Sequence, residues 1–153
     1  MNAGGPPRRE APAADGLLAA NSMNIIGLGM DATEIIRIER TIERFGDRFL
    51  QRVFTEAEIV YATRRRNPAP HFAARFAAKE AAMKALGTGR SRGVLWRDIE
   101  VARAGGPPQL RFHGGAARQF EAIGATGSLL TITHSQTLAL AHVLLLGTGI
   151  GAR

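Results

Sequence analysis

The residues best suited to chemistry lie in one stretch, Arg75 to Gly89, which reads RFAAKEAAMKALGTG. The spacing predicts a helix that carries Glu80 and Lys84 one turn apart on the same side. The tripeptide Gly87-Thr88-Gly89 would end this helix, because glycine is common just past the last turn. Its backbone can approach a ligand closely, and its threonine has a hydroxyl to offer. A carboxylate, an ammonium group and a glycine-flanked threonine suit a metal-bound substrate that carries phosphate.

The surroundings of Glu80 and Lys84 leave a second interpretation open. Alanines at 73, 77 and 81 line the helix beside them, so something flat or bulky could lie against that arc. A Glu–Lys pair at this spacing is, however, most often a solvated salt bridge worth a few tenths of a kcal/mol. The tripeptide GTG also recurs at 147–149 and carries little weight alone. A catalytic role therefore requires a second, independent carboxylate.

Asp31 supplies this second carboxylate. It follows the apolar run NIIGLGM at 24–30, which we interpret as a strand that ends at Asp31. Gly27, Gly29 and Ala32 match the dinucleotide-binding fingerprint, but that fingerprint requires a second strand ending in an acidic residue about 20 residues on. This sequence predicts continued helix there, and Asp31 would repel a pyrophosphate unless a cation came between them. With a metal ion present, the same carboxylate becomes a ligand.

Length and composition describe one domain without disulfides. The chain has 153 residues, of which 45% are hydrophobic, so a core can form. Cysteine is absent, which excludes thiolate metal sites and fits the cytoplasm. No apolar run approaches the roughly 20 residues of a membrane span. We expect residues 1–22 to be a disordered leader, either an artificial remnant or the product of an early start codon, 23–147 to form the domain, and 148–153 to be a flexible C-terminus.

The net charge of +7 belongs to residues 23–153, because the charges of the first 22 residues cancel. A surface of that sign attracts nucleic acid, anionic membranes, or an acidic protein or cofactor. Arg37, Arg40 and Arg44 form a stripe on the helix predicted at 33–45, apart from its apolar face. A solvated charged face is the commoner reason for such a stripe, but it also suits the docking of an acidic helix.

The other segments predict short helices and antiparallel hairpins. The capping box that begins at Thr55 predicts a helix from Glu56 to about Arg64. We further expect a short helix at 116–123 and strands at 96–102, 109–113, 128–133 and 138–146. His134 lies at the turn between the last two strands. The sequence therefore predicts an α+β fold, an antiparallel sheet packed with helices in a single domain.

Taken in this order, the motifs resemble those of the holo-acyl-carrier-protein synthases, which are small 4′-phosphopantetheinyl transferases. The similarity covers roughly residues 24–146. It rests on GLGMD at 27–31 with the following Ile/Arg helix, RFAAKE at 75–80 with Lys84 and GTG at 87–89, DIEV at 98–101, and TITHS at 131–135. The resemblance implies the phosphopantetheinyl transferase-like fold. It also implies transfer of the phosphopantetheine arm of coenzyme A to a serine of an acyl carrier protein, with release of adenosine 3′,5′-bisphosphate.

The resemblance further implies roles for single residues. Asp31 and Glu80 would hold a Mg²⁺ ion that bridges oxygens of the pyrophosphate. Lys84 would stabilise or protonate the leaving phosphate. Arg75 and the tripeptide Gly87-Thr88-Gly89 would lie near the nucleotide.

Two further implications concern binding partners. His134 matches a family histidine at the site, which either orients the phosphates or holds the turn. Arg37, Arg40 and Arg44 match the surface that receives the acidic helix of the carrier protein. Members of the family form homotrimers with sites between adjacent subunits, so a chain of this length could enclose coenzyme A without a second domain. Nothing in the sequence identifies the general base.

Other functions use the same features differently. A basic nucleic-acid-binding protein would explain the charge and the loop Arg64-Arg65-Arg66, but aromatic residues are only 6% of the chain and Asp31 and Glu80 stay unexplained. A metal-dependent phosphohydrolase would use the same carboxylates with water as nucleophile, although two acids are few for a paired-metal site. A non-catalytic trimeric scaffold is a third alternative. We therefore expect coenzyme A and an acidic carrier protein as partners, and neither nucleic acid nor a membrane.

Overall fold

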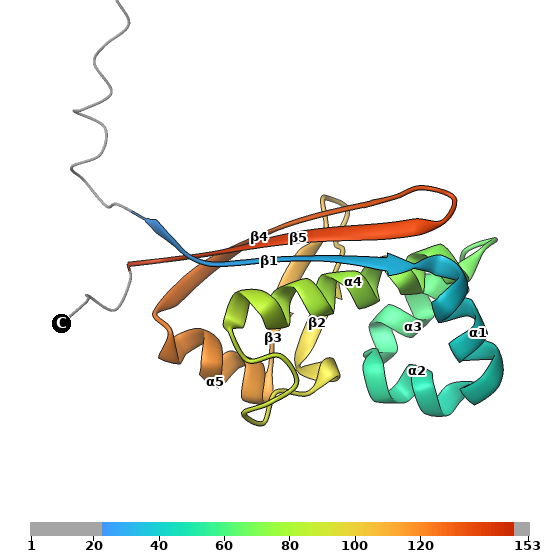
Figure 1. Ribbon diagram of the computed structural model, residues 1–153, viewed down its shortest axis with the longest axis horizontal. Coiled ribbons are helices and arrows are strands. Elements are labelled where there is room, and N and C mark those ends of the chain that lie inside the picture. Colours follow the sequence, from blue (N-terminus) through green and yellow to red (C-terminus); the bar gives the residue numbers. More distant parts are fainter. Residues whose placement is uncertain (1–22, 149–153) are drawn as a thin grey trace, which may run out of the picture.

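The computed structural model describes residues 23–148, so the expectations for residues 1–22 and 149–153 lie outside the described part of the chain. Helices and strands cover most of it (Figure 1). In chain order the elements are β1 (Asn24–Glu34), α1 (Ile35–Phe45), α2 (Asp47–Val53), α3 (Glu56–Thr63), α4 (Pro68–Leu86), η2 (Trp96–Asp98), β2 (Ile99–Ala102), β3 (Gln109–Phe112), α5 (Gly114–Ala122), β4 (Ala125–His134) and β5 (Leu138–Gly147). None of the helices within residues 23–148 is long and apolar enough to cross a lipid bilayer.

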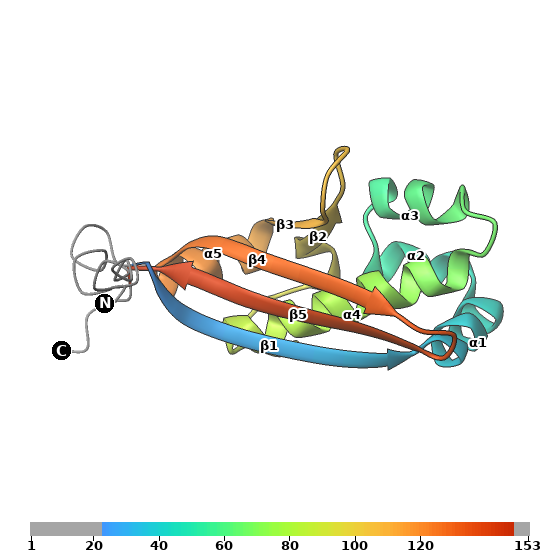
Figure 2. The same cartoon turned by 90° about the horizontal axis from the view of Figure 1, so that it is seen from above.

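A three-stranded antiparallel sheet in the order β1-β5-β4 forms one long layer of the molecule. Helix α4 runs along one face of this sheet, and α1, α2 and α3 gather at one end (Figures 1 and 2). Strands β2 and β3 make a separate hairpin. The α+β prediction, with an antiparallel sheet and helices packed against it, is confirmed.

The central strand β5 has one buried and one open face. Its inward side chains are between 0 and 2% exposed, and they are Ala139, Ala141, Val143 and Leu145. The opposite face of the sheet is apolar but uncovered within the described residues, since Leu28 is 61%, Met30 63% and Leu129 55% exposed. Large apolar side chains exposed together on one face mark a contact surface.

The alanine arc of α4 is buried against this sheet. Ala73, Ala77 and Ala81 are all 0% exposed. The flat surface that lies against this arc is therefore the chain's own sheet, and the arc is not open to a ligand.

Glycines in β1 allow the close approach of α4. A Cβ atom on Gly29 would overlap the carbonyl oxygen of Ala81, and one on Gly27 would overlap that of Ala85. The two glycines of the apparent dinucleotide fingerprint thus serve helix–strand packing. This close contact sets the distance between the end of β1 and the side chains of α4.

Two of the wrongly predicted boundaries have clear causes, one long-range and one local. Strand β1 continues past Asp31 to Glu34, because it pairs with β5 along its whole length. Residues Trp96–Asp98 form a 3-10 turn instead of the start of a strand. The Asp98 carboxylate holds this turn by accepting hydrogen bonds from the backbone N–H groups of Leu95, at 3.0 Å, and Gly115, at 3.1 Å.

A buried ion pair joins α3 to α4. Lys79 Nζ lies 2.8 Å from Glu58 Oε2, and the two side chains are 0% and 1% exposed. Lys79 also donates to the carbonyls of Trp96, at 3.2 Å, and Ile99. Glu58 accepts from the Thr55 N–H at 2.8 Å, which completes the predicted capping box. Because every charge has several partners, the pair fixes α4 against α3 and β2.

Candidate active site

Asp31 and Lys84 meet where β1 passes along α4. Lys84 Nζ donates to Asp31 Oδ1 at 2.9 Å and to the Met30 carbonyl at 2.9 Å. Asp31 and Lys84 are 53 residues apart in the chain. Thr33 Oγ1 donates to the other carboxylate oxygen of Asp31 at 2.8 Å. The Lys84 side chain is 51% exposed, so its ammonium group remains open to solvent. The predicted Lys84 therefore reaches the predicted second carboxylate instead of forming a helix pair with Glu80.

Glu80 lies one turn earlier on α4 and is partly buried. Burial raises the pKa of its carboxyl group, and the negative charge of Asp31 raises it further. The positive charges of Lys84, Arg90 and Arg37 act in the opposite direction. Asp31 and Glu80 are thus close enough to repel each other. We call Asp31, Glu80 and Lys84 the carboxylate group.

This donor set fits a magnesium ion. The described residues contain no cluster of three or more His, Cys, Asp or Glu side chains that could enclose a metal by themselves. Mg²⁺ usually keeps several waters and takes one or two carboxylates together with substrate phosphate oxygens. A cation between Asp31 and Glu80 would relieve the repulsion that raises the pKa of Glu80. Asp31 and Glu80 therefore suit a metal ion whose coordination shell is completed by water and by oxygens of the substrate.

The backbone of the glycine turn after α4 is as predicted, but the hydroxyl group of Thr88 is not placed as predicted. Gly87 ends the helix in the left-handed region, with φ 72°, and Gly89 has φ 53°. Thr88 is only 6% exposed, and its Oγ1 donates to the Gly89 carbonyl at 3.1 Å. The hydroxyl that we expected to face a ligand therefore holds the turn in this conformation.

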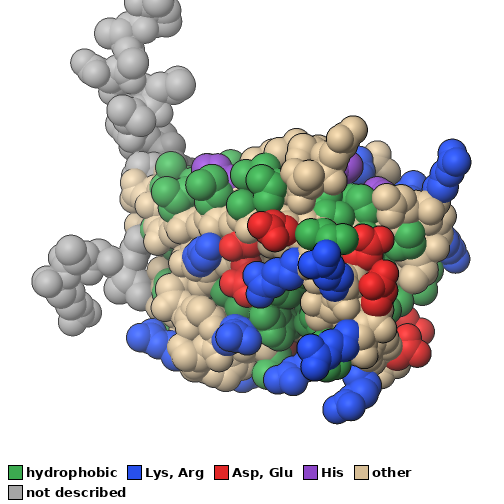
Figure 3. All heavy atoms as spheres, turned by 45° about the vertical axis from the view of Figure 1, so that its right-hand side comes forward, with side chains coloured by type: hydrophobic (Ala, Val, Ile, Leu, Met, Phe, Trp, Pro, Cys, Tyr) green, Lys and Arg blue, Asp and Glu red, His purple; other side chains and the backbone are tan. Residues whose placement is uncertain are grey.

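The arginine stripe of α1 borders the carboxylate group. Arg37, Arg40 and Arg44 are all exposed, and Arg37 is close enough to influence the pKa of Glu80. Figure 3, which brings the α1 side forward, shows basic side chains around a group of acidic ones, with hydrophobic side chains between them. The stripe therefore begins at the candidate site and leads away from it across the surface.

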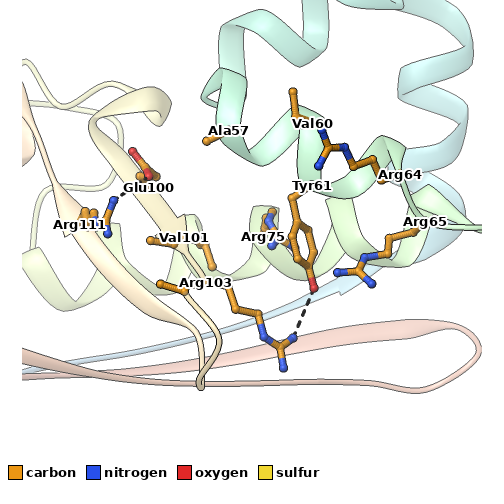
Figure 4. A pocket seen from close by; sticks show the side chains of 12 residues that line it. Ala57, Val60, Tyr61, Arg64, Arg65, Arg75, Glu100, Val101, Arg103 and Arg111 are labelled. Carbon is orange, nitrogen blue, oxygen red and sulfur yellow. Dashed lines mark hydrogen bonds and ion pairs between the residues drawn. The ribbon is translucent and has the colours of Figure 1, made fainter.

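Arg75 lies in a different place. It is five positions before Glu80, which turns its side chain about 140° around the helix. There it helps to line a pocket of about 610 Å³ between α3 and the β2–β3 hairpin (Figure 4). The lining is strongly basic and consists of Ala57, Val60, Tyr61, Arg64, Arg65, Arg75, Glu100, Val101, Ala102, Arg103, Ala104 and Arg111. None of the three residues of the carboxylate group belongs to it.

Arg75 is positioned by stacking. Its guanidinium carbon lies 3.9 Å from the centre of the Tyr61 ring, and its Nη1 donates to the His71 carbonyl at 3.4 Å. Arg75 is 5% exposed, and its Nε is the buried side-chain polar atom of the described residues that has no hydrogen-bond partner. Arg103 donates to the Tyr61 hydroxyl at 3.4 Å. A buried cation with a free donor beside a basic pocket can bind an anion.

His134 belongs to this second location. Its ring centre lies 6.3 Å from that of His71, which in turn lies 6.0 Å from Tyr61. Burial lowers the pKa of His71, and the positive charges of Arg65 and Arg75 lower it further. We call Arg75, His134, His71 and Tyr61 the arginine–histidine group. Sequence reasoning missed His71 and Tyr61, although the placement of His71 one helical turn before Arg75 could have indicated it.

The predicted site residues therefore fall into two groups on different sides of α4. The carboxylate group lies at β1 with the arginine stripe beside it. The arginine–histidine group lies toward α3 and the end of β4. One copy of the chain does not bring the two groups together.

Comparison with known proteins gives consistent results at three levels. The model of the 4′-phosphopantetheinyl transferase superfamily matches residues 27–140. A holo-[acyl-carrier-protein] synthase from Solibacter usitatus is 51% identical over 122 residues, which are 79% of this chain and 98% of the relative.

Solved structures agree. The crystal structure of holo-[acyl-carrier-protein] synthase from Neisseria meningitidis has a TM-score of 0.74 and 31% identity, covering 80% of this chain and 98% of the other. The synthase from Bacillus anthracis, solved in complex with coenzyme A (3′,5′-ADP), has a TM-score of 0.67 and 35% identity, covering 83% and 100%. The chain described here therefore belongs to the 4′-phosphopantetheinyl transferase superfamily, among the holo-[acyl-carrier-protein] synthases.

Proposed function

We propose that the protein transfers 4′-phosphopantetheine from coenzyme A to a serine of an apo acyl carrier protein and releases adenosine 3′,5′-bisphosphate. The observation that carries this proposal is the contact of Lys84 with Asp31, beside the partly buried Glu80. These are the charged residues that a phosphoryl-transfer site needs, in a chain about half identical to synthases of this name. The complex of the Bacillus anthracis relative with coenzyme A supports the choice of donor.

The reaction breaks a phosphoanhydride bond and forms a phosphate ester. The serine oxygen forms a bond to the phosphorus that carries pantetheine, and the bond from that phosphorus to the bridging oxygen of the pyrophosphate breaks. The electron pair stays with the adenosine phosphate, and the serine proton leaves for a base that stays unassigned. Asp31 and Glu80 would hold Mg²⁺, which when bound neutralises charge on the phosphates.

Lys84 is the residue best placed to serve the leaving phosphate. Its ammonium group is half exposed and is held by one carboxylate and one carbonyl, Asp31 and Met30. A flexible lysine can therefore turn from Asp31 to a phosphate oxygen at little cost. There it would stabilise the growing charge or donate a proton to it.

We further propose that the complete site forms between adjacent subunits of a homotrimer. The arginine–histidine group lies away from the carboxylate group of the same copy, and Arg75 Nε lacks a partner. The basic pocket beside it suits phosphate groups of the nucleotide. The exposed apolar face of the sheet suits a second copy, because Leu28, Met30 and Leu129 have no cover within the described residues.

The arginine stripe is the proposed docking surface for the carrier protein. Arg37, Arg40 and Arg44 lie exposed on one helix, and Arg37 lies near Glu80. An acidic helix bound there would reach the carboxylate group with its serine.

A cytoplasmic location stays a prediction.

One experiment tests the reaction itself. The protein is mixed with Mg²⁺, coenzyme A and an apo acyl carrier protein, and the carrier is weighed by mass spectrometry. We expect a gain of one phosphopantetheine that is lost with a chelator and in Asp31→Asn and Glu80→Gln. Glu121→Gln, an exposed carboxylate on α5, is the matched control and should keep full activity.

Two other outcomes would contradict the proposal. Phosphate release from coenzyme A without a mass gain on the carrier would indicate a phosphohydrolase. Binding of DNA with a steep salt dependence, without any transfer, would indicate a nucleic-acid-binding protein.

A further inference from the structure

His142 lies in the middle of the uncovered face of the sheet. It is on the central strand β5, where its neighbours Ala141 and Val143 point inward and are 2% and 0% exposed. The alternation of a strand therefore turns His142 outward. Across the sheet it lies opposite Met30 of β1 and Thr131 of β4.

The other charged side chains of these strands lie elsewhere. On β1, Asp31 points to the α4 side, where it binds Lys84, and Glu34 lies on the outer face but at its far end, opposite Leu138. On β4, His134 is at the strand's end and approaches His71 of α4. Within the described residues, His142 is therefore the titratable group at the centre of an apolar face.

We propose that protonation of His142 opposes self-association through this face, so that acidification dissociates the assembly. This inference rests on the proposed self-association of the sheet's outer face. A neutral imidazole can be covered by another copy, since it is compact and can satisfy its N–H group locally. An imidazolium covered by the Leu and Met side chains of this face would lose its hydration without gaining a counter-ion. The separated subunits, in which His142 stays in water, are then favoured.

The sign and steepness follow from proton linkage. Dissociated chains bind more protons than assembled ones, so the association constant falls as the pH decreases. Each copy carries one such histidine, so a trimer releases up to one proton per chain as it forms. At acidic pH, the logarithm of the monomer–trimer association constant should then fall by up to about three for each unit by which the pH decreases, because the slope equals the number of protons released on assembly.

Sedimentation velocity over a dilution series, from about pH 8 to about pH 5.5, measures this effect across the histidine range. For the unaltered chain we expect a monomer–trimer constant at least about tenfold lower at the acidic end, while circular dichroism reports an intact fold. His142→Gln, which keeps a neutral polar side chain, should remain assembled at both ends. His142→Lys, which carries a permanent charge, should be monomeric even at about pH 8. His113→Gln, which changes a half-exposed histidine outside these three strands, serves as the control and should still dissociate in acid.

The outcomes separate this inference from the proposed function. Assembly that is unchanged by pH, or dissociation of His142→Gln in parallel with the unaltered chain, would overturn it. A chain that is monomeric at every pH and concentration would refute self-association itself, whatever the transfer assay gives. Acid loss of transfer activity should be reversed by raising the protein concentration in the unaltered chain. In His142→Gln it should not depend on protein concentration.

Discussion

Two lysines on α4 should respond in opposite ways to the same substitution. Lys84 touches the proposed chemistry, whereas Lys79 is a buried structural residue five positions earlier. Replacing each with methionine keeps an unbranched side chain of similar length and removes only the charge. The comparison therefore separates loss of catalysis from loss of stability on one helix.

Lys84→Met should leave the fold nearly unaffected. The Lys84 and Asp31 side chains are 51% and 16% exposed, so their ion pair contributes on the order of 0.2–1 kcal/mol after solvent screening. For a domain of this size that lowers Tm by at most about 4 °C. If Lys84 stabilises the leaving phosphate, kcat should nevertheless fall by about 10²–10³-fold, which is the effect of removing one donor at a developing negative charge.

Lys79→Met should do the reverse. The Lys79–Glu58 pair is 0% and 1% exposed, and removing one partner leaves a carboxylate buried without its counter-ion. Such a loss costs about 3–5 kcal/mol. Glu58 keeps the N–H groups of Thr55 and Val101, at 2.8 Å each, so we expect the lower end, about 3 kcal/mol. Molecules that remain folded should still transfer phosphopantetheine.

Mass gain of the apo carrier protein measures transfer, and thermal unfolding followed by circular dichroism measures stability. The assays are run well below both melting temperatures. If Lys84→Met lost activity only in proportion to its loss of folded protein, the assigned role of Lys84 would be wrong. If Lys79→Met were as stable as the unaltered chain, the buried pair would not hold α4 in place.

Three further predictions follow from single contacts. Gly29→Ala should lower the free energy of unfolding, measured by chemical denaturation, by about 3 kcal/mol, because its Cβ would overlap the backbone of α4. Gly106→Ala is the control: its Cβ meets open space, so the free energy of unfolding should change by less than about 0.5 kcal/mol. In steady-state kinetics, the double variant Arg37→Ala, Arg40→Ala should raise the KM for the carrier protein about tenfold and leave the KM for coenzyme A unchanged. Equal effects on the two KM values would refute docking of the carrier protein on the stripe. Burial lowers the pKa of His71, and nearby arginines lower it further, so the folded protein favours the neutral imidazole. The free energy of unfolding should therefore decrease as the pH falls below the ordinary histidine range. His71→Gln should reduce this decrease, as measured by melting curves between about pH 7 and pH 5.

The local features of the chain could be predicted from its sequence because they depend on neighbours in the chain. The capping box at Thr55 and the left-handed glycine at 87 follow from backbone groups a few residues away. Helical spacing likewise placed Glu80 and Lys84 one turn apart. The apolar run at 138–146 likewise predicted the strand that the structure shows as β5.

Long-range distances could not be predicted in this manner. Periodicity tells which side chains share a face, but not which surface that face meets. The alanine arc of α4 was open to a ligand or to the chain itself, and the structure decided for the sheet because Gly27 and Gly29 admit the helix backbone. The same close packing gave Lys84 a partner 53 residues away in place of its helical neighbour.

The sequence by itself determined the identities of the charged residues, the helix that carries them and the family to which they belong. Only the tertiary structure decided that Asp31 joins Glu80 and Lys84. It also decided that Arg75 lies on another side of the helix beside Tyr61, and that His134 of β4 lies beside His71. The physical reason is that a helix turns by about 100° per residue, so positions five apart face different neighbours. Which neighbours these are depends on how strands and helices far apart in the chain pack together.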